Sequence, residues 1–173
     1  PSMDKTSDAE EKFTSSLEFV LTGAQKRTWE EIRSDLKGNR PMRRLLQGDV
    51  GSGKTLVGAL SALHAYENGW QTAFMCPTEI LAEQHHLSLS EWFSSLGLSV
   101  ELLTGSTKSS ERKEIITKLK SGEINILVGT HALFQKDVIF NCLGLTVIDE
   151  QHRFGVHQRS VSYTHLTLPT TPY

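Results

Sequence analysis

Short apolar runs alternate with longer amphipathic stretches between residues 25 and 148. A short run of mostly apolar residues has the length of a buried strand, whereas apolar positions three or four apart predict a helix. We predict strands over 44–47, 71–76, 100–103, 124–128 and 145–148. We predict helices over 25–37, 55–68, 79–96 and 109–119, and a short helix over 131–135. This alternation predicts an α/β domain, with a mostly parallel sheet and helices on both faces.

Both ends of the chain depart from this alternation. The residues up to about Leu17 are rich in Ser, Asp, Glu and Lys, which predicts a linker or the end of a preceding domain. Near the other end, the run Val-Ser-Tyr-Thr-His-Leu-Thr-Leu-Pro-Thr at 161–170 looks like the translation of a common transposase-based sequencing adapter. The alternative is a genuine terminal strand, because Thr, Tyr and Leu favour strands. We expect a linker over 1–18, one lobe of a truncated gene over 19–160, and a translated artefact that makes few native contacts over 161–173.

The composition is that of one folded domain without an unusual charge. A chain of 173 residues with 38% hydrophobic content can bury one core. The net charge of −2 predicts no global basic field, so any contact with nucleic acid must be local. Cys76 and Cys142 lie in apolar surroundings without metal spacing, which favours buried thiols in a reducing compartment. Because no apolar run reaches membrane-spanning length, we expect a soluble, cytoplasmic protein without a membrane partner.

A glycine-rich segment lies between the strand predicted over 44–47 and the helix predicted over 55–68. It fits the pattern G-x-x-x-x-G-K-[ST], whose glycines let backbone N–H groups converge on a polyphosphate at the start of a helix. Lys54 would reach the β- and γ-phosphates, and the Thr55 hydroxyl would bind Mg²⁺. The alternative is a Gly/Ser-rich turn that fits by chance. The candidate phosphate-binding residues are Gly48, Asp49, Val50, Gly51, Ser52, Gly53, Lys54 and Thr55.

Two carboxylates, Asp149 and Glu150, follow the last predicted strand. Ligands of parallel α/β sheets bind outside the carboxyl ends of the strands, where Asp149 and Lys54 would meet if their strands are neighbours. Asp149 would hold Mg²⁺ through water, and Glu150 would orient and deprotonate an attacking water. The alternative is a solvated acidic turn. Together with Lys54, these residues form the predicted catalytic set.

Six blocks, in this order, resemble the motifs of superfamily 2 helicases. They lie at 21–25, 48–55, 77–85, 103–106, 128–133 and 149–156. Their joint presence is more specific than any single block, and the resemblance covers about 19–159. It implies the first RecA-like lobe of an ATP-dependent DNA helicase that uses ATP and Mg²⁺ and acts on branched DNA in recombination and repair. The alternative within the family is another superfamily 2 DNA translocase. We expect a monomer.

The resemblance also implies roles for residues outside the phosphate site. It assigns Gln25 to the adenine edge, although Thr22 and Gln25 also fit a helix capping box. It assigns Gln151 and His152 to coupling between the nucleotide and the facing lobe. Contacts to the DNA backbone are implied for Thr78, Thr104, Gly105, Thr130 and His131. For Thr78 and Thr130 the alternative is helix capping, and His131 also fits a satisfied polar residue.

Three further histidines carry no role in the predicted site, and two other functions fit part of the sequence. We expect His85, His86 and His157 at the surface or in turns, and not as metal ligands. A small-molecule kinase or a GTPase would leave 149–152 unexplained, and the guanine-reading Asn-Lys-x-Asp of a GTPase is absent from the sequence. A non-catalytic nucleotide-binding module is the other alternative, because a second lobe would supply the arginine that stabilises the transferred phosphoryl group.

Overall fold

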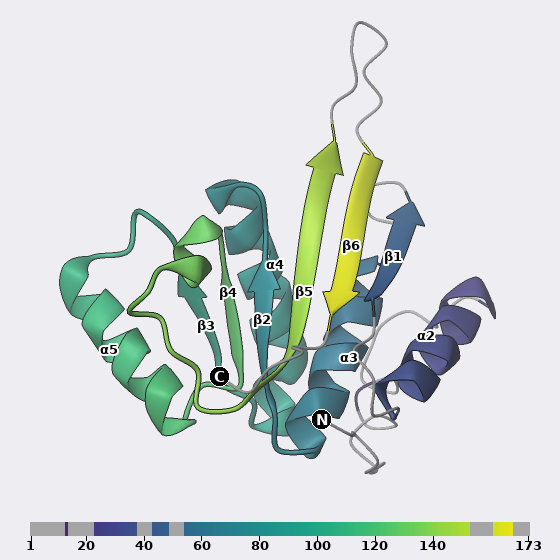
Figure 1. Ribbon diagram of the computed structural model, residues 1–173, viewed down its shortest axis with the longest axis horizontal. Coiled ribbons are helices and arrows are strands. Elements are labelled where there is room, and N and C mark those ends of the chain that lie inside the picture. Colours follow the sequence, from purple (N-terminus) through teal and green to yellow (C-terminus); the bar gives the residue numbers. More distant parts are fainter. Residues whose placement is uncertain (1–12, 14–22, 38–42, 49–53, 153–160, 168–173) are drawn as a thin grey trace, which may run out of the picture.

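The computed structural model describes residues 13, 23–37, 43–48, 54–152 and 161–167. Every helix and strand predicted between residues 25 and 148 is present, and the short helix predicted over 131–135 is a 3-10 turn. The elements, in chain order, are α2 (Gly23–Leu36), β1 (Arg43–Gly48), α3 (Lys54–Glu67), β2 (Gln71–Met75), α4 (Glu79–Phe93), η1 (Ser94–Leu96), β3 (Val100–Leu103), α5 (Ser109–Ser121), β4 (Ile126–Gly129), η2 (His131–Phe134), β5 (Leu143–His152) and β6 (Val161–Thr167) (Figure 1).

The strands form a six-stranded sheet in the order β1-β6-β5-β2-β4-β3. β2 pairs in parallel with both β4 and β5, and β3 pairs in parallel with β4. β6 is antiparallel to both of its neighbours, β1 and β5. The predicted mostly parallel α/β sheet is therefore confirmed, with one antiparallel strand inserted.

The two faces of the sheet are covered by different helices, as the alternation along β2 shows. Phe74 faces a core cluster that includes buried residues of α2, α3 and α4. Its neighbours Ala73 and Met75 face a second cluster, formed with α5 and η2. Successive side chains of a strand point to opposite faces, so β2 contributes to both cores. Each fully buried large apolar side chain stabilises the fold by roughly 1.5–3 kcal/mol.

Local hydrogen bonds fix where α4 begins and where α5 ends. The Thr78 side chain accepts a hydrogen bond from the Leu81 amide at 3.3 Å and so caps α4. At the end of α5, Gly122 has a φ of 87°, and its amide donates to the carbonyls of Leu119 and Lys118. A glycine takes this left-handed conformation without the steric cost of a Cβ.

A buried glutamine joins three elements at the amino end of the sheet. The Gln71 side chain donates to the carbonyls of Leu119 and Ile124 at 3.0 and 2.7 Å. Its oxygen accepts a hydrogen bond from the Cys142 amide at 2.8 Å. Because each of these bonds satisfies a buried polar group, Gln71 holds α5, the approach to β4 and the approach to β5 in fixed relation.

Residues in both terminal segments make contacts with the rest of the domain. Phe13 is fully buried, and its ring lies 5.1 Å from that of Phe93 and 6.2 Å from that of Trp92. The segment before Leu17 therefore contributes one apolar side chain to the core. The expectation of few native contacts is wrong for Val161–Thr167, because β6 pairs along its length with β1 and β5. The adapter origin of this segment stays a prediction.

None of the helices within the described residues has the length and apolar content needed to cross a membrane.

Candidate nucleotide-binding site

The glycine-rich segment lies in the context that a P-loop requires. β1 ends at Gly48, and α3 begins at Lys54. The first turn of a helix leaves backbone N–H groups without intrahelical partners, and these groups attract anions. The predicted strand before the glycine-rich segment and the predicted helix after it are therefore confirmed. The residues between them, Asp49, Val50, Gly51, Ser52 and Gly53, lie outside the described residues, so their contacts with phosphate stay a prediction.

The predicted carboxylates lie within β5 and not after it. β5 pairs with β2 only as far as Ile148, which pairs with Met75. Beyond that point it continues to His152 because it pairs with β6, starting with Asp149 opposite Thr164. The prediction that the strand ends at residue 148 is thus wrong, although Asp149 is still the first residue beyond the parallel register. Glu150, Gln151 and His152 occupy the rest of this extension.

β1 and β5 are not neighbours, because β6 lies between them. Two successive antiparallel pairings nevertheless make β1 and β5 parallel to each other, so their carboxyl ends lie at the same edge of the sheet. Strands two positions apart are separated by roughly 9–10 Å. The two halves of the predicted site therefore share an edge, and one side chain connects them.

His85 of α4 makes that connection. Its Nε2 lies 2.8 Å from Oδ2 of Asp149, and its Nδ1 lies 3.4 Å from Oγ1 of Thr55. The side chains of His85 and Asp149 are only 13% and 12% exposed. The imidazole thus contacts one predicted ligand of Mg²⁺ from each half of the site. The expectation that His85 is a surface or turn residue is wrong.

The surroundings of Asp149 are largely shielded from water. Burial raises the pKa of the neighbouring Cys76 thiol, and the negative charge of Asp149 raises it further. Both effects disfavour a thiolate, so Cys76 is neutral and does not compete as an anionic ligand. Cys76 and Cys142 are both free thiols; Cys76 is buried as predicted, whereas Cys142 is half-buried.

The donors brought together here suit magnesium. A hydroxyl and a carboxylate are hard oxygen ligands, and Mg²⁺ is typically bound through one or two carboxylates together with substrate phosphates and water. No group of three or more His, Cys, Asp or Glu side chains is placed to hold a metal ion in the described part of the chain. Thr55 and Asp149 therefore fit a magnesium site that is completed by a nucleotide, and not a metal cage made by the protein.

The predicted DNA contacts come together at the same edge of the sheet. Thr78 follows β2, Thr104 and Gly105 follow β3, and Thr130 and His131 follow β4. Because these strands are parallel, the loops after them open on one side. Thr78, Gly105 and His131 are exposed, whereas Thr130 is half-buried.

The capping alternatives have different outcomes at the two threonines. Thr78 does cap α4 through its hydroxyl. Thr130 occupies the N-cap position of η2 without a side-chain capping bond, so the capping explanation fails there. Contact with DNA stays a prediction for both residues.

The loop after β3 is held by its own hydroxyls and by α4. Thr104 is buried, its hydroxyl accepts a hydrogen bond from the Ser106 amide, and its amide donates to Oγ1 of Thr107 at 3.0 Å. The Ser106 hydroxyl donates to Oε2 of Glu79 at 2.7 Å. Thr104 therefore shapes the loop, and Gly105 is the exposed member of the predicted pair. The link from Glu79 was not predicted from the sequence.

Gly129 lets β4, β3 and η2 approach closely before Thr130. A Cβ added at this position would collide with the Leu103 carbonyl oxygen and would lie 2.8 Å from Cδ2 of Leu133. No other residue type fits without displacing backbone, so this glycine sets the position of the loop that carries Thr130 and His131.

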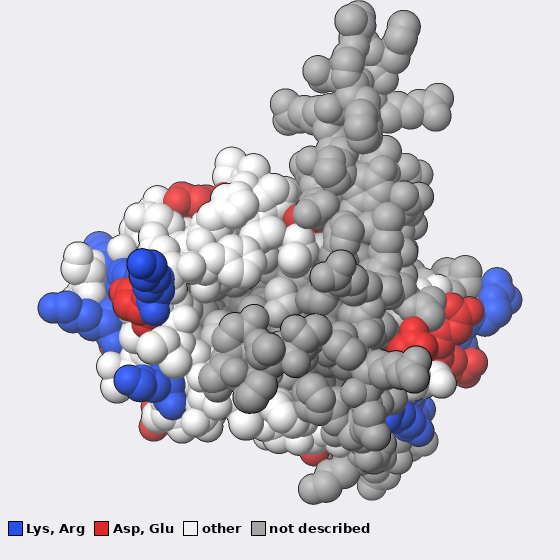
Figure 2. Space-filling model, in the orientation of Figure 1, with Lys and Arg blue, Asp and Glu red and all other residues white. Residues whose placement is uncertain are grey.

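The visible charge is mixed. In Figure 2, blue and red side chains lie close together over α5 and again over α2. The described surface of this face shows no extended field of Lys and Arg. One contact between α5 and the η2–β5 loop is ionic, with Arg112 2.6 Å from Asp137. This distribution agrees with the prediction that any contact with nucleic acid is local.

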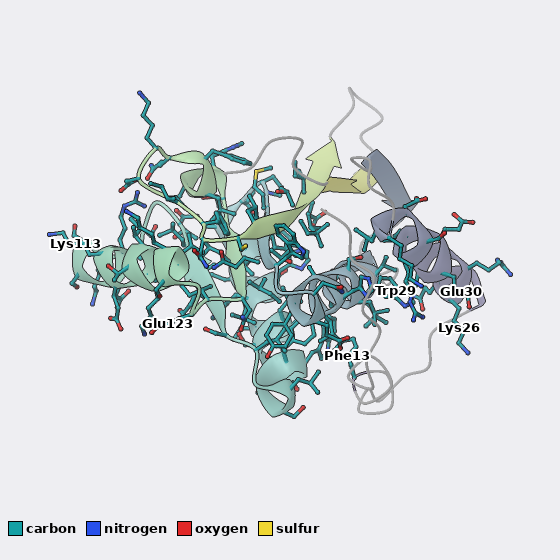
Figure 3. All side chains as sticks on the ribbon, turned by 60° about the horizontal axis from the view of Figure 1, so that its bottom comes forward. Phe13, Lys26, Trp29, Glu30, Lys113 and Glu123 are labelled. Atoms are coloured by element: carbon teal, nitrogen blue, oxygen red, sulfur yellow. The ribbon has the colours of Figure 1, made fainter. Side chains whose placement is uncertain are left out.

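Gln25, predicted to contact adenine, lies on α2 and is half-buried. Figure 3 shows Lys26 and Glu30 of this helix pointing away from the body, whereas Trp29 lies on the side toward α3. There the Trp29 ring meets that of His64 edge-on, with centroids 6.2 Å apart. The adenine contact and the capping box with Thr22 both stay predictions, since Thr22 lies outside the described residues.

A periodic signal for His85 was present in the sequence. It lies three residues after Ala82 and four before Leu89, both of which are buried in α4. This spacing places it on the core side of the helix. Its partner could not be found in this way, because Asp149 lies 64 residues further along the chain.

Comparison with known proteins gives one consistent result. Residues 22–171 match the DEAD/DEAH box helicase family. The chain is 58% identical over 150 residues to an ATP-dependent DNA helicase RecG from Synechocystis sp., covering 87% of this chain and 18% of the relative. It is 56% identical over 149 residues to the protein of the same name from Thermotoga maritima, covering 86% of this chain and 19% of the relative.

A solved structure agrees with the curated relatives. It is described as RecG bound to a three-way DNA junction and matches with a TM-score of 0.79 and 52% identity, over 89% of this chain and 21% of that one. The match confirms the RecA-like lobe. Among superfamily 2 proteins, the Asp-Glu-Gln-His block at 149–152 and the Leu-Thr-Gly-Ala-Gln block at 21–25 favour RecG over the transcription-repair coupling factor and PriA. That interpretation is confirmed too.

The chain spans about a fifth of the length of the relatives that it matches. The family is matched over most of the chain, and the nucleotide-site geometry agrees with it. The chain belongs to the DEAD/DEAH box helicase family.

Proposed function

We propose that this chain is the first nucleotide-binding lobe of an ATP-dependent DNA helicase or translocase that acts on branched DNA in recombination and repair. The relatives are named as ATP-dependent DNA helicases, and the related structure holds a three-way DNA junction. Those names support the substrate class. The cytoplasmic location and the monomeric state expected from the sequence belong to the same proposal.

The observation that carries the proposal is the connection of Thr55 and Asp149 through His85. These two residues come from the two halves of the predicted site, in segments 94 residues apart (149 minus 55). Their assembly at the carboxyl edge is what a phosphate-binding site with magnesium requires. If the Gly/Ser-rich segment and the acidic segment fitted their motifs by chance, nothing would bring them to the same edge of the sheet. Contact of both segments with one imidazole would be even less expected.

Each residue of the site has a proposed part in ATP hydrolysis. The P-loop backbone and Lys54 bind the β- and γ-phosphates, and Gln25 reads the adenine edge. Thr55 and Asp149 hold Mg²⁺, which neutralises charge on the phosphate oxygens when it is bound. Glu150 orients the attacking water and accepts its proton. Gln151 and His152, further along the same strand, pass the state of the site to the facing lobe.

DNA would bind along the loops at the same edge. Thr78, Thr130 and His131 offer side-chain donors, and Gly105 offers an exposed backbone, whereas the buried Thr104 supports the loop. Hydroxyls and backbone N–H groups are common ligands of DNA phosphates and carry no sequence information. Binding should therefore be independent of sequence and weakened by salt.

The experiment compares this chain with a longer protein that includes the second lobe. For the chain alone we expect weak MgATP binding, at most trace ATPase activity and no fork unwinding. An arginine from a second lobe is worth roughly 10³ to 10⁵ in rate in P-loop enzymes. The longer protein should hydrolyse ATP faster with branched DNA than with a linear duplex of the same length. Equal stimulation by both DNAs would contradict the substrate class. ATP hydrolysis that no DNA stimulates would favour a different P-loop enzyme.

A further inference from the structure

His85 has both ring nitrogens engaged by residues of the nucleotide site. Nε2 lies 2.8 Å from the Asp149 carboxylate, and Nδ1 lies 3.4 Å from the Thr55 hydroxyl. A carboxylate oxygen only accepts hydrogen bonds, so Nε2 is the nitrogen that carries the hydrogen. In the neutral ring Nδ1 is then an acceptor, and the Thr55 hydroxyl donates to it. The two partners thus fit the Nε2–H tautomer of the neutral ring.

We propose that His85 is a positioning residue that orients both magnesium ligands, Thr55 and Asp149, through the two nitrogens of one imidazole. This inference rests on the proposed nucleotide site and adds to it a residue that lies in neither the P-loop nor the carboxylate segment. His85 comes from α4, the helix that follows β2.

The hydrogen-bond directions favour this role. A hydroxyl that binds a cation through its oxygen must direct its hydrogen elsewhere, and Nδ1 accepts that hydrogen. The bond from Nε2 engages Oδ2 of Asp149 and does not use the second carboxylate oxygen. Partners of this kind orient metal ligands, and their removal typically costs about 10- to 100-fold in metal affinity.

The core of the protein holds the imidazole in place. Its ring centroid lies 5.1 Å from that of Phe74 on β2, at an interplanar angle of 42°. Ala82 and Leu89, on the same side of α4, are fully buried. The side chain itself is 13% exposed. Because packing limits rotation of the ring, its nitrogens point to fixed positions, as a positioning residue requires.

A residue that is only structural would have a different signature. Loss of packing around Phe74 would lower thermal stability and weaken nucleotide binding whether or not magnesium is present. Loss of ligand orientation would raise the magnesium concentration that binding requires and leave magnesium-free binding unchanged. Measuring nucleotide binding at increasing magnesium concentrations therefore separates a structural role from a positioning role.

The test uses purified chain and four variants: His85→Ala, His85→Gln, His85→Asn and His86→Ala. Gln places its amide nitrogen near the position of Nε2, so it can still donate to Asp149. Asn places its amide oxygen near the position of Nδ1, so it can still accept from Thr55. His86 is the matched control, because its ring contacts the Val100 carbonyl at 3.2 Å and not the nucleotide site.

Binding of a fluorescent ATP analogue is measured as MgCl₂ is added, together with the thermal midpoint of each variant. We expect His85→Ala to raise the magnesium midpoint at least about tenfold. His85→Gln should recover more than His85→Asn, because the bond to Asp149 is the shorter one. His86→Ala should match the original chain. An unchanged midpoint in His85→Ala, or an equal loss of magnesium-free binding, would overturn the proposal.

A second measurement needs no nucleotide. Nitrogen NMR of the imidazole in the metal-free chain should show the Nε2–H tautomer, with the Nδ1 signal shifted by Thr55→Ala and the Nε2 signal shifted by Asp149→Asn. The Nδ1–H tautomer would overturn the inference even if the chain binds no nucleotide. If the expected tautomer is present but no MgATP binds, it is the proposed function that fails for this chain.

Discussion

The two halves of the sheet differ in how their strands pair. β2, β4 and β3 are parallel, and helices or 3-10 turns follow each of them. β1, β6 and β5 are held by antiparallel pairing, and in Figure 1 the upper ends of β5 and β6 extend beyond the other strands. The first half carries the loops proposed for DNA, and the second carries the segments proposed for the nucleotide.

Asp149 lies where the two halves meet. β5 is parallel to β2 as far as Ile148 and pairs only with β6 beyond it. The difference teaches that the nucleotide segments are joined by antiparallel pairing through β6, whereas the DNA loops follow strands that are parallel to one another. Substitutions in the P-loop should therefore change nucleotide binding and spare DNA binding, whereas α4 contributes to both sites through His85 and Glu79.

The largest effect is expected at Glu150. In a protein that includes the second lobe, Glu150→Gln should keep ATP binding and lose roughly 10² to 10⁴ in turnover, the range for a positioned general base. Steady-state ATPase rates and nucleotide affinity measure the two effects. Asp149→Ala is the comparison, since it should weaken magnesium-dependent binding instead. Normal turnover in Glu150→Gln would show that the roles are assigned wrongly.

Lys54→Ala should abolish detectable MgATP binding and leave the fold intact. The ammonium group is proposed as a phosphate ligand at the start of α3, so its loss should cost at least about tenfold in affinity, or ~1.4 kcal/mol. Calorimetry of the isolated chain measures it, with circular dichroism as the control for folding. DNA affinity should stay the same, because the DNA loops belong to the other half. Binding equal to that of the original chain would contradict the P-loop assignment.

Deletion of residues 161–173 tests whether β6 belongs to the second half. The pairing on both sides predicts a loss of a few kcal/mol in the free energy of unfolding, since each backbone hydrogen bond contributes about 0.5–1.5 kcal/mol. The adapter hypothesis instead requires a change within about 0.5 kcal/mol. Urea unfolding of the shortened chain decides between them. An unchanged free energy would remove β6 from the native sheet and leave β1 and β5 free to become neighbours.

Gly129→Ala should destabilise the parallel half by roughly 1–3 kcal/mol, the usual cost of overpacking. Its Cβ would meet the Leu103 carbonyl and Leu133. Gly105→Ala is the matched control, because its Cβ would lie 3.4 Å from a Glu79 oxygen at the end of a side chain. Thermal melts compare the two. Weaker DNA binding by Gly129→Ala, with MgATP binding preserved, would support the division between the halves. Equal stability of both variants would contradict the close approach at Gly129.

Much of the fold and part of the site could be predicted from the sequence. Apolar periodicity located the helices and strands from α2 to β5, because burial of one face leaves a local repeat in the chain. The spacing of glycines before Lys54 indicated the strand–loop–helix context, and the carboxylates were found at the edge where β5 leaves its parallel partner. These signals are local, so one sequence contains them.

Only the tertiary structure decided how distant segments meet. It placed β6 between β1 and β5, joined Gln71 to three elements, and brought His85 to Thr55 and Asp149. Periodicity reports which side of an element is buried but not which element covers it. The hydrogen bond between His85 and Asp149 depends on β2 and β5 being neighbours in the sheet, and packing of the whole domain sets that order of strands.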